Sequence, residues 1–277
     1  MKILLIGAGG MLGMDLQPIL STQHEVIGKD IPDLDISDPG QVRREIEKTR
    51  PDMVINLAAL TDVDGCESRK ERAFSVNGHG AGHVARACEA AGAKLIHLST
   101  DYVFDGTSPI PYREEDPPHP LNVYGESKLL GERAIEGVGK NHLILRTAWL
   151  YGRHGKNFVD TILRLASQQE ELRVVNDQMG PPTFTRDLGW AISQLADKEV
   201  RGILHVTNSG CCTWFEFAEK ILSLKPHGRI RILPVTSCEL NRPAKRPAFS
   251  VLDCSRFERI IGRRMRHWEE SLREYLS

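Results

Sequence analysis

The sequence predicts an α/β protein: a Rossmann-like, doubly wound parallel sheet with a smaller, interleaved C-terminal α+β domain. Two observations lead to this fold class. Short apolar runs alternate with segments of helical periodicity as far as Trp149, and a glycine-rich turn directly follows the first apolar run. Alternation of this kind produces right-handed βαβ units, in which the strands are parallel and helices cover both faces of the sheet.

The elements of the first half follow from composition and spacing. Runs rich in leucine or β-branched residues, bounded by Gly, Pro, Asp or Asn, are typical of buried strands. They predict strands at Lys2–Ile6, Glu25–Gly28, Met53–Ala58, Lys94–Ser99 and His142–Arg146. The amphipathic segments between them predict helices at Met11–Ser21, Pro39–Thr49, Lys70–Ala91 and Val123–Glu136. Ligands of such sheets bind beyond the carboxyl ends of the strands, so functional residues are expected there.

Beyond Trp149 the alternation is less regular. The patterns predict helices at Asn157–Gln168, Arg186–Lys198, Trp214–Ser223, Ser255–Gly262 and His267–Leu276, and strands at Leu172–Asn176 and Gly202–Val206. We therefore expect residues 1–149 to form a dinucleotide-binding domain, to which the segments near 172–178 and 184–206 return. Residues 150–171 and 207–277 are expected to form a substrate-binding domain.

Composition narrows the class of protein. The chain has 277 residues, of which 40% are hydrophobic and 26% charged, as in an ordinary globular protein. Its net charge of −1 argues against a nucleic-acid partner, and no apolar run approaches the length of a membrane span. The N-terminus lacks a signal-peptide pattern, and the six cysteines show no ligand spacing. We expect a cytoplasmic monomer or homodimer without membrane or nucleic-acid partners.

The glycine turn predicts a dinucleotide site. Gly7, Gly10 and Gly13 follow the first strand and open a helix, where bare backbone and a helix N-terminus receive a pyrophosphate. Asp30 ends the second strand and is placed to bind ribose hydroxyls, which favours NAD over NADP. A structural turn with a structural aspartate is the alternative. Further candidates for cofactor contacts are Met11, Leu12, Asp35, Ile36, Ala58, Ala59, Leu60, Thr61 and Leu98.

A second constellation predicts carbonyl chemistry. Tyr124 and Lys128 are one turn apart on one helix face, and Thr100 follows the fourth strand at the ligand-binding edge. A phenol of pKa about 10 is a weak acid at neutral pH, and a nearby ammonium favours its ionised form. We expect Tyr124 to be the general acid, Lys128 to assist it and hold the nicotinamide ribose, and Thr100 to polarise a carbonyl group. A buried tyrosine, a surface lysine and a strand-end threonine without function are the alternative.

Taken together, these motifs resemble the extended short-chain dehydrogenase/reductase family, and within it the dTDP-4-dehydrorhamnose reductase branch. The first half supplies the glycine turn, Asn56-Leu-Ala-Ala, Ser99-Thr-Asp-Tyr-Val-Phe-Asp-Gly106 and Asn122-Val-Tyr-Gly-x-Ser-Lys128. The second half supplies Arg146-Thr-Ala-Trp-Leu-Tyr-Gly152, Asn157-Phe, Asn176-Asp-Gln-x-Gly-x-Pro-Thr183, Thr213-Trp and Arg246-Pro-x-x-Ser250. The resemblance covers essentially the whole chain.

This resemblance implies a reaction and a substrate site. The expected reaction is reduction of the 4-keto group of dTDP-4-dehydro-L-rhamnose to dTDP-L-rhamnose by NADPH or NADH, with the cofactor preference open. The expected substrate ligands are Thr100, Asp101, Tyr102, Tyr124, Trp149, Asn157 and Arg246. Arg246 lies in a basic segment suited to a diphosphate. Asp15 and Asp187 stand where relatives carry acids, so a Mg²⁺ site is a further expectation.

Other functions of the same fold stay open from the sequence. Sugar 4,6-dehydratases place an Asp-Glu pair after the threonine, whereas here Asp101 is followed by Tyr102, which favours simple ketone reduction. Another nucleotide-sugar ketoreductase or an epimerase is one alternative, because such enzymes have a tyrosine and a lysine that match Tyr124 and Lys128. A non-catalytic, nucleotide-binding regulatory subunit is the alternative outside enzymes, and the intact catalytic residues weigh against it.

Overall fold

A computed structural model describes residues 1–226 and 230–277 of the chain. Its centre is a six-stranded sheet of order β10-β5-β4-β3-β1-β2, with every neighbouring pair parallel. The strands are β1 (Lys2–Ile6), β2 (Glu25–Lys29), β3 (Met53–Asn56), β4 (Lys94–Thr100), β5 (His142–Thr147) and β10 (Gly202–His205). The predicted doubly wound, Rossmann-like sheet is confirmed, and its strand order reverses around β1.

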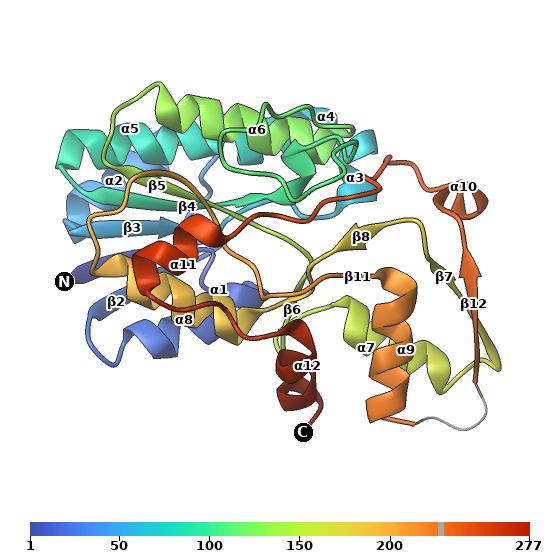
Figure 1. Cartoon of the computed structure of the whole chain (residues 1–277). Coiled ribbons are helices and arrows are strands. Elements are labelled where there is room, and N and C mark those ends of the chain that lie inside the picture. Colours follow the sequence, from blue (N-terminus) through green and yellow to red (C-terminus); the bar gives the residue numbers. More distant parts are fainter. Residues whose placement is uncertain (227–229) are drawn as a thin grey trace.

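Helices cover both faces of this sheet (Figure 1). One face carries α1 (Met11–Leu20), α8 (Thr185–Ala196) and α11 (Ser255–Ile261), and the other α2 (Pro39–Thr49), α5 (Ala81–Ala91) and α6 (Val123–Glu136). Successive side chains of β1 enter the two cores alternately: Ile3 and Leu5 face α1, while Leu4 and Ile6 face α2. Burial on both faces explains why β1 is apolar from Ile3 to Ile6 and why β3 and β5 are buried along their whole length.

A second, smaller lobe is assembled from short strand pairs and helices (Figure 1). Its strands pair as β6 (Leu150–Tyr151) with β9 (Thr183–Phe184), β7 (Glu171–Val175) with β12 (Arg231–Val235), and β8 (Met179–Gly180) with β11 (Cys212–Thr213). Its helices are α7 (Phe158–Ala166), α9 (Trp214–Leu224), α10 (Ser237–Leu240) and α12 (Trp268–Leu276). Its separate core contains aromatic side chains, among them Phe217 and Trp268, together with aliphatic ones.

Two segments lie elsewhere than expected. The strand predicted near 172–178 pairs with β12 and does not return to the large sheet. Its residues Glu171 and Arg173 are exposed, and a strand inside a sheet covered on both faces has no exposed side. Conversely, α11, which was assigned to the substrate-binding domain, inserts Phe257 into the core shared by α1 and α8.

The helix predicted over residues 70–91 is interrupted. The structure has α3 (Val63–Ser68), α4 (Lys70–Ala73), a π-helical segment (Phe74–Gly80) and then α5. Within the π-helical segment, Asn77 is buried and its amide binds both backbone groups of Leu60 at 2.8 and 3.0 Å. Such wide turns often mark functional sites. Here Asn77 anchors the loop that follows β3.

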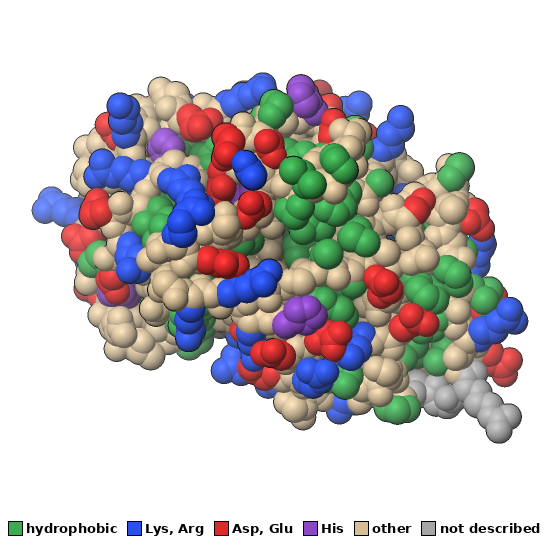
Figure 2. Space-filling model, viewed as in Figure 1, with side chains coloured by type: hydrophobic (Ala, Val, Ile, Leu, Met, Phe, Trp, Pro, Cys, Tyr) green, Lys and Arg blue, Asp and Glu red, His purple; other side chains and the backbone are tan. Residues whose placement is uncertain are grey.

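The surface carries charges of both signs. Figure 2 shows Lys and Arg side chains interspersed with Asp and Glu over the face drawn, without a continuous basic stripe. In the parts of the chain that the structure describes, no helix combines the length and apolar character that a bilayer crossing requires.

Candidate active site

A cleft of about 420 Å³ lies beyond the carboxyl ends of the strands, where the strand order reverses. It receives side chains from the turn after β1 and from the ends of β3, β4 and β5, together with the start of α6. Of the predicted site residues, it brings together Gly7, Gly10, Met11, Leu12, Gly13, Ala59, Thr61, Leu98, Thr100, Asp101, Tyr124, Lys128 and Trp149. The glycine turn and the proposed catalytic residues therefore share one site.

Two glycines of the turn are required by close backbone contacts. Gly7 has φ of +84°, and a Cβ added to it would lie 2.8 Å from the backbone nitrogen of Ala58. A Cβ on Gly13 would lie 2.3 Å from the carbonyl oxygen of Gly7. Side chains at either position would separate α1 from β1 or the turn from β3. The turn thereby presents bare backbone and the N-terminus of α1 to the cleft, as a pyrophosphate requires.

Asp30 lies at the end of β2 beside this turn. Its carboxylate accepts hydrogen bonds from the backbone N–H groups of Gly9 at 2.9 Å and Ile31 at 2.8 Å. Asp35 lies further along and accepts hydrogen bonds from Ser37 and Arg72. These hydrogen bonds hold the pKa of Asp35 below its ordinary value despite the opposing effect of burial. Neither acid lines the cleft itself, and Ile36, Ala58 and Leu60 are also outside its lining.

The catalytic candidates converge as the spacing predicts. Asn122 caps α6 by accepting from the backbone N–H of Gly125 at 2.8 Å, which fixes the helix start just before Tyr124. Tyr124 and Lys128 then face the cleft one turn apart, and Thr100 of β4 lines the same cleft. Lys128 is buried and donates to the carbonyl oxygen of Leu98 at 2.5 Å.

Burial dominates the proton affinities in this site. It raises the pKa of Tyr124, which only the side chain of Thr100 lowers, so the phenol is protonated at neutral pH. Burial also lowers the pKa of Lys128 to about 8, against the attraction of Glu132. The sequence led us to expect a lysine that lowers the pKa of the phenol. In the free protein Lys128 is not among the groups that lower the pKa of the phenol, and loss of solvent around the phenol raises it.

Asp101 is the acidic group in the cleft. Burial raises the pKa of its carboxyl group to about 7, against the lowering effect of the hydrogen bond with Thr100. One carboxyl oxygen accepts from Thr100 Oγ1 at 3.0 Å, and the other is buried without a partner among the residues that the structure describes. That oxygen is available to a polar group of a ligand.

Trp149 lines one side of the cleft and belongs to an aromatic pair. Trp149 stacks on Trp214 with ring centroids 3.5 Å apart and planes within 6°. Trp149 has φ of +48°, a strained conformation for a bulky residue, and a Cβ on Gly180 would lie 2.5 Å from its indole ring. Tyr102 meets the ring of Tyr124 edge-on at 5.9 Å. Such apolar faces are suited to the apolar side of a deoxy sugar.

Three residues expected at the substrate lie outside the cleft lining: Tyr102, Asn157 and Arg246. Asn157 caps α7 by accepting from the backbone N–H of Asp160 at 3.0 Å, and its amide also donates to Gly152 O. Arg246 makes a double hydrogen bond with Asp64, at 2.8 Å for each oxygen. Both side chains are already engaged within the protein.

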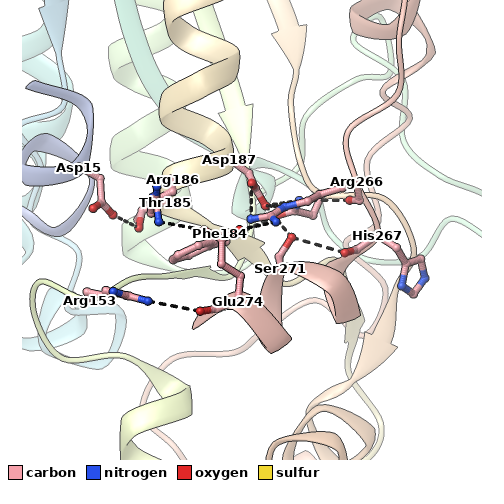
Figure 3. Close-up of polar contacts among 11 residues, drawn as sticks. Asp15, Arg153, Phe184, Thr185, Arg186, Asp187, Arg266, His267, Ser271 and Glu274 are labelled. Carbon is pink, nitrogen blue, oxygen red and sulfur yellow. Dashed lines mark hydrogen bonds and ion pairs between the residues drawn. The ribbon is translucent and has the colours of Figure 1, made fainter. Parts of the chain in front are cut away.

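The expected Mg²⁺ site is not supported. No group of three or more His, Cys, Asp or Glu side chains able to hold a metal occurs among the described residues. Figure 3 shows the reason. Both carboxylate oxygens of Asp187 are bound by Arg266, at 2.7 and 2.9 Å, and Ser271 also donates to it. Asp15 instead accepts from Thr185. A guanidinium group thus occupies the place at Asp187 that a cation would take.

Several residues of the site were missed by the sequence analysis. Lys156 lines the cleft from the second lobe, and Asn77 anchors the loop after β3. His97 lies under Lys128, with Nε2 and Nζ 3.3 Å apart. Lys156 directly precedes Asn157, the capping residue of α7, and this position was the signal in the sequence that could have identified it. His97 stands inside an apolar strand, and only the packing of β4 against α6 shows what its ring contacts.

Comparisons with known proteins agree with this geometry. Residues 1–277 match the family model described as RmlD substrate binding domain. The chain is 45% identical to the spore coat polysaccharide biosynthesis protein SpsK of Bacillus subtilis, over 99% of this chain and 96% of the relative. It is 40% identical to a dTDP-4-dehydrorhamnose reductase of Sinorhizobium fredii, with the same coverage.

Solved structures of such reductases have the same fold. That from Clostridium acetobutylicum superposes with a TM-score of 0.96 at 40% identity, covering 100% of this chain and 98% of the other. That from Bacillus anthracis, in complex with NADP, has a TM-score of 0.95 at 39% identity, covering 99% and 98%. With its whole length matched by the family model and its cleft built around the family's motifs, the chain belongs to the RmlD substrate-binding-domain family of extended short-chain dehydrogenases/reductases.

Proposed function

We propose that this protein is an NAD(P)H-dependent reductase that converts dTDP-4-dehydro-L-rhamnose to dTDP-L-rhamnose. The observation that carries the proposal is the convergence of Thr100, Tyr124 and Lys128 with the glycine turn in one cleft. Relatives named dTDP-4-dehydrorhamnose reductase match nearly the whole chain. Reduction of a keto sugar is therefore the chemistry that both the site and the relatives support.

The cleft fits a nicotinamide cofactor at one end. Gly7 and Gly13 let the turn pack closely against β3 and α1, which brings bare backbone and the N-terminus of α1 to the cleft for a pyrophosphate, and Asp30 lies beside the turn where adenosine ribose hydroxyls would bind. A reduced nicotinamide bound there supplies the hydride. A relative was solved with NADP. We propose that this protein uses either NADPH or NADH. The reason is that the Asp30 carboxylate already accepts a hydrogen bond from the backbone N–H of Gly9, so a ribose hydroxyl is not its only partner.

The protein's own residues supply the remaining chemistry. Thr100 and Tyr124 line the same cleft, so their hydroxyls can be directed at one carbonyl oxygen. As negative charge develops on that oxygen, the Tyr124 O–H bond breaks and a new O–H bond forms on the sugar. Lys128 stabilises the resulting phenolate. Asp101 offers a free carboxyl oxygen to a sugar hydroxyl, and Trp149 covers the apolar side.

The test is turnover with a purified keto sugar. We expect the wild-type protein to oxidise NADPH or NADH only when dTDP-4-dehydro-L-rhamnose is present. Tyr124→Phe should lower kcat by about 10³-fold while cofactor affinity changes little, because only the proton donor is lost. Cofactor absorbance measures the rate, and fluorescence titration measures cofactor binding.

Phe104 provides a control of ring loss elsewhere. It is a buried aromatic residue outside the cleft, so Phe104→Leu should lower stability without removing the proton donor. Absence of turnover by wild-type protein, or full activity of Tyr124→Phe, would refute the proposal. Tight cofactor binding without turnover of the keto sugar is instead the result expected of a regulatory nucleotide-binding subunit.

A further inference from the structure

A chain of three buried polar side chains runs beneath the catalytic helix. Asn56 on β3 and His97 on β4 are register partners, and both are completely buried. The amide nitrogen of Asn56 is 3.2 Å from Nδ1 of His97, and Nε2 of the same ring is 3.3 Å from Nζ of Lys128. The imidazole therefore joins the end of β3 to the lysine of the active site.

The backbone fixes which ring nitrogen carries the proton. Asn56 Oδ1 accepts from the N–H of Ala58 at 3.2 Å, so the amide group must turn its NH₂ toward His97. Nδ1 is then the acceptor. Burial and the charge of Lys128 lower the pKa of His97 well below its ordinary value, so the ring is neutral and its single proton is on Nε2. The Nε2–H group thus points at Lys128.

An N–H donor at that place favours the neutral amine form of Lys128 over the ammonium form. A neutral amine has a lone pair that can accept from Nε2–H, whereas an ammonium would bring two donors face to face at 3.3 Å. The bond from Nζ to Leu98 O survives in either state, because both forms have N–H groups. The other ionisable groups around α6 at this level are Tyr124, Glu132, Asp101 and Arg146. Arg146 and Ser99 hold Glu132 in a fixed position, so its attraction is constant.

We propose that His97 is a positioning residue that holds the Lys128 amine in place and, through its Nε2–H group, eases the loss of a proton from it. The kinetic consequence rests on the proposed function. After Tyr124 has given its proton to the sugar, the phenolate must regain one before the next turnover. An N–H bond of Lys128 breaks, the O–H bond of Tyr124 re-forms, and the neutral amine accepts from His97. A proton from solvent later restores the ammonium.

Two substitutions should raise the proton affinity of Lys128 by different routes. In His97→Gln, the amide oxygen can face Nζ and accept from the ammonium. In Asn56→Asp, the carboxylate accepts from Nδ1–H, so the ring tautomer reverses and Nε2 presents a lone pair to the ammonium. We expect the pKa of Lys128 to rise by about one unit in each variant. Chemical shifts of isotope-labelled lysine Cε measure it directly, with the resonance assigned by its absence in Lys128→Met.

A matched control is available on another strand of the same sheet. His205 on β10 is also fully buried, its pKa is lowered to about 3 by burial, and its ring contacts Tyr112 O. His205→Gln disturbs the same sheet without touching Lys128, so it should leave the lysine titration unchanged. Thermal unfolding shows whether each variant is folded, and Asn56→Asp serves if His97→Gln does not fold.

Kinetics give the second measurement. The alkaline limb of kcat, where Lys128 loses its proton, should move to higher pH in His97→Gln and in Asn56→Asp, with kcat at neutral pH lower by about fivefold. An unchanged lysine titration in both variants, or an equal shift in His205→Gln, overturns the proposal. If the NMR shift occurs in a protein that reduces no keto sugar, the proposed function fails while the role of His97 stands.

Discussion

Asp101 shows how one side chain can be fitted to a ligand at a cost in stability. It is buried in the cleft with one oxygen unpartnered, and burial raises the pKa of its carboxyl group to about 7. A group whose pKa is raised on folding stabilises the folded state at low pH, below its unfolded pKa. That contribution is lost as the pH rises through the folded value. Asp101 thus destabilises the free protein above neutral pH, where the unfolded chain ionises freely.

Replacing this carboxyl group should remove the dependence of stability on pH that Asp101 causes. We expect Asp101→Asn to raise the thermal unfolding midpoint at pH 8 by several degrees and to change it little at pH 4, because only the ionised form is penalised. Substrate KM should rise in the same variant, since the amide presents a donor where the carboxylate accepts. Scanning calorimetry across this pH range measures the first effect. Equal changes of the midpoint at both pH values would contradict it.

At the scale of elements, a buried ion pair joins the catalytic helix to the sheet. Glu132 on α6 binds Arg146 on β5 at 2.7 Å and 3.0 Å, and also accepts from Ser99 on β4. Both charged side chains are at most 2% exposed. Removing one partner leaves the other charge buried and uncompensated, which costs more than the intact pair contributes.

We expect Glu132→Ala to lower the free energy of unfolding by about 3 to 5 kcal/mol, because Arg146 then lacks its counter-charge. Glu126→Ala is the matched control, since Glu126 is exposed on the same helix, and it should change stability by less than about 0.5 kcal/mol. Denaturant unfolding measures both. Similar losses in the two variants would show that the pair does not have this role.

Local signals in the sequence predicted most elements of the first lobe. The predicted bounds of α2 and α6 match the structure because Asp38 and Asn122 cap them and Pro39 occupies the first turn of α2. The strand β12 was missed, since it contains Pro234 and pairs with a segment 60 residues earlier in the register Arg231↔Glu171. Such pairings depend on tertiary contacts that no local pattern contains.

The same distinction holds for the site. Thr100, Tyr124 and Lys128 were predicted because each stands at an element end or on a helix face that sequence spacing defines. The contact of His97 with Lys128 depends on how β4 packs under α6, and the pairing of Arg266 with Asp187 joins residues 79 positions apart. At Asp187, where we expected a metal site, the structure therefore has an ion pair with Arg266.

For the whole molecule, the basic C-terminal segment connects the two lobes. Lys225–Ser277 contains 12 basic and 6 acidic residues by count. Within it, Arg246 reaches Asp64 of α3, and Lys245 O accepts from Asn122 at the start of α6. The hydrogen bond with Arg246 holds the pKa of Asp64 below its ordinary value. The part of this segment around Lys245 and Arg246, here called the strap, therefore holds the substrate lobe beside the catalytic helix α6.

The charge of Arg246 also acts on Tyr102, whose ring meets Tyr124, so the same guanidinium borders the substrate region. We propose that it binds the substrate diphosphate in addition to fastening the strap, since a guanidinium has more donors than Asp64 can accept. Arg246→Ala should then raise KM for the dTDP-sugar by about tenfold or more, whereas Asp64→Asn, which releases the strap but keeps the guanidinium, should raise it less than about threefold. Cofactor KM should change little in both variants. Equal effects of the two substitutions on the sugar KM would mean that Arg246 only fastens the strap, and the diphosphate must then be held by other donors of the cleft.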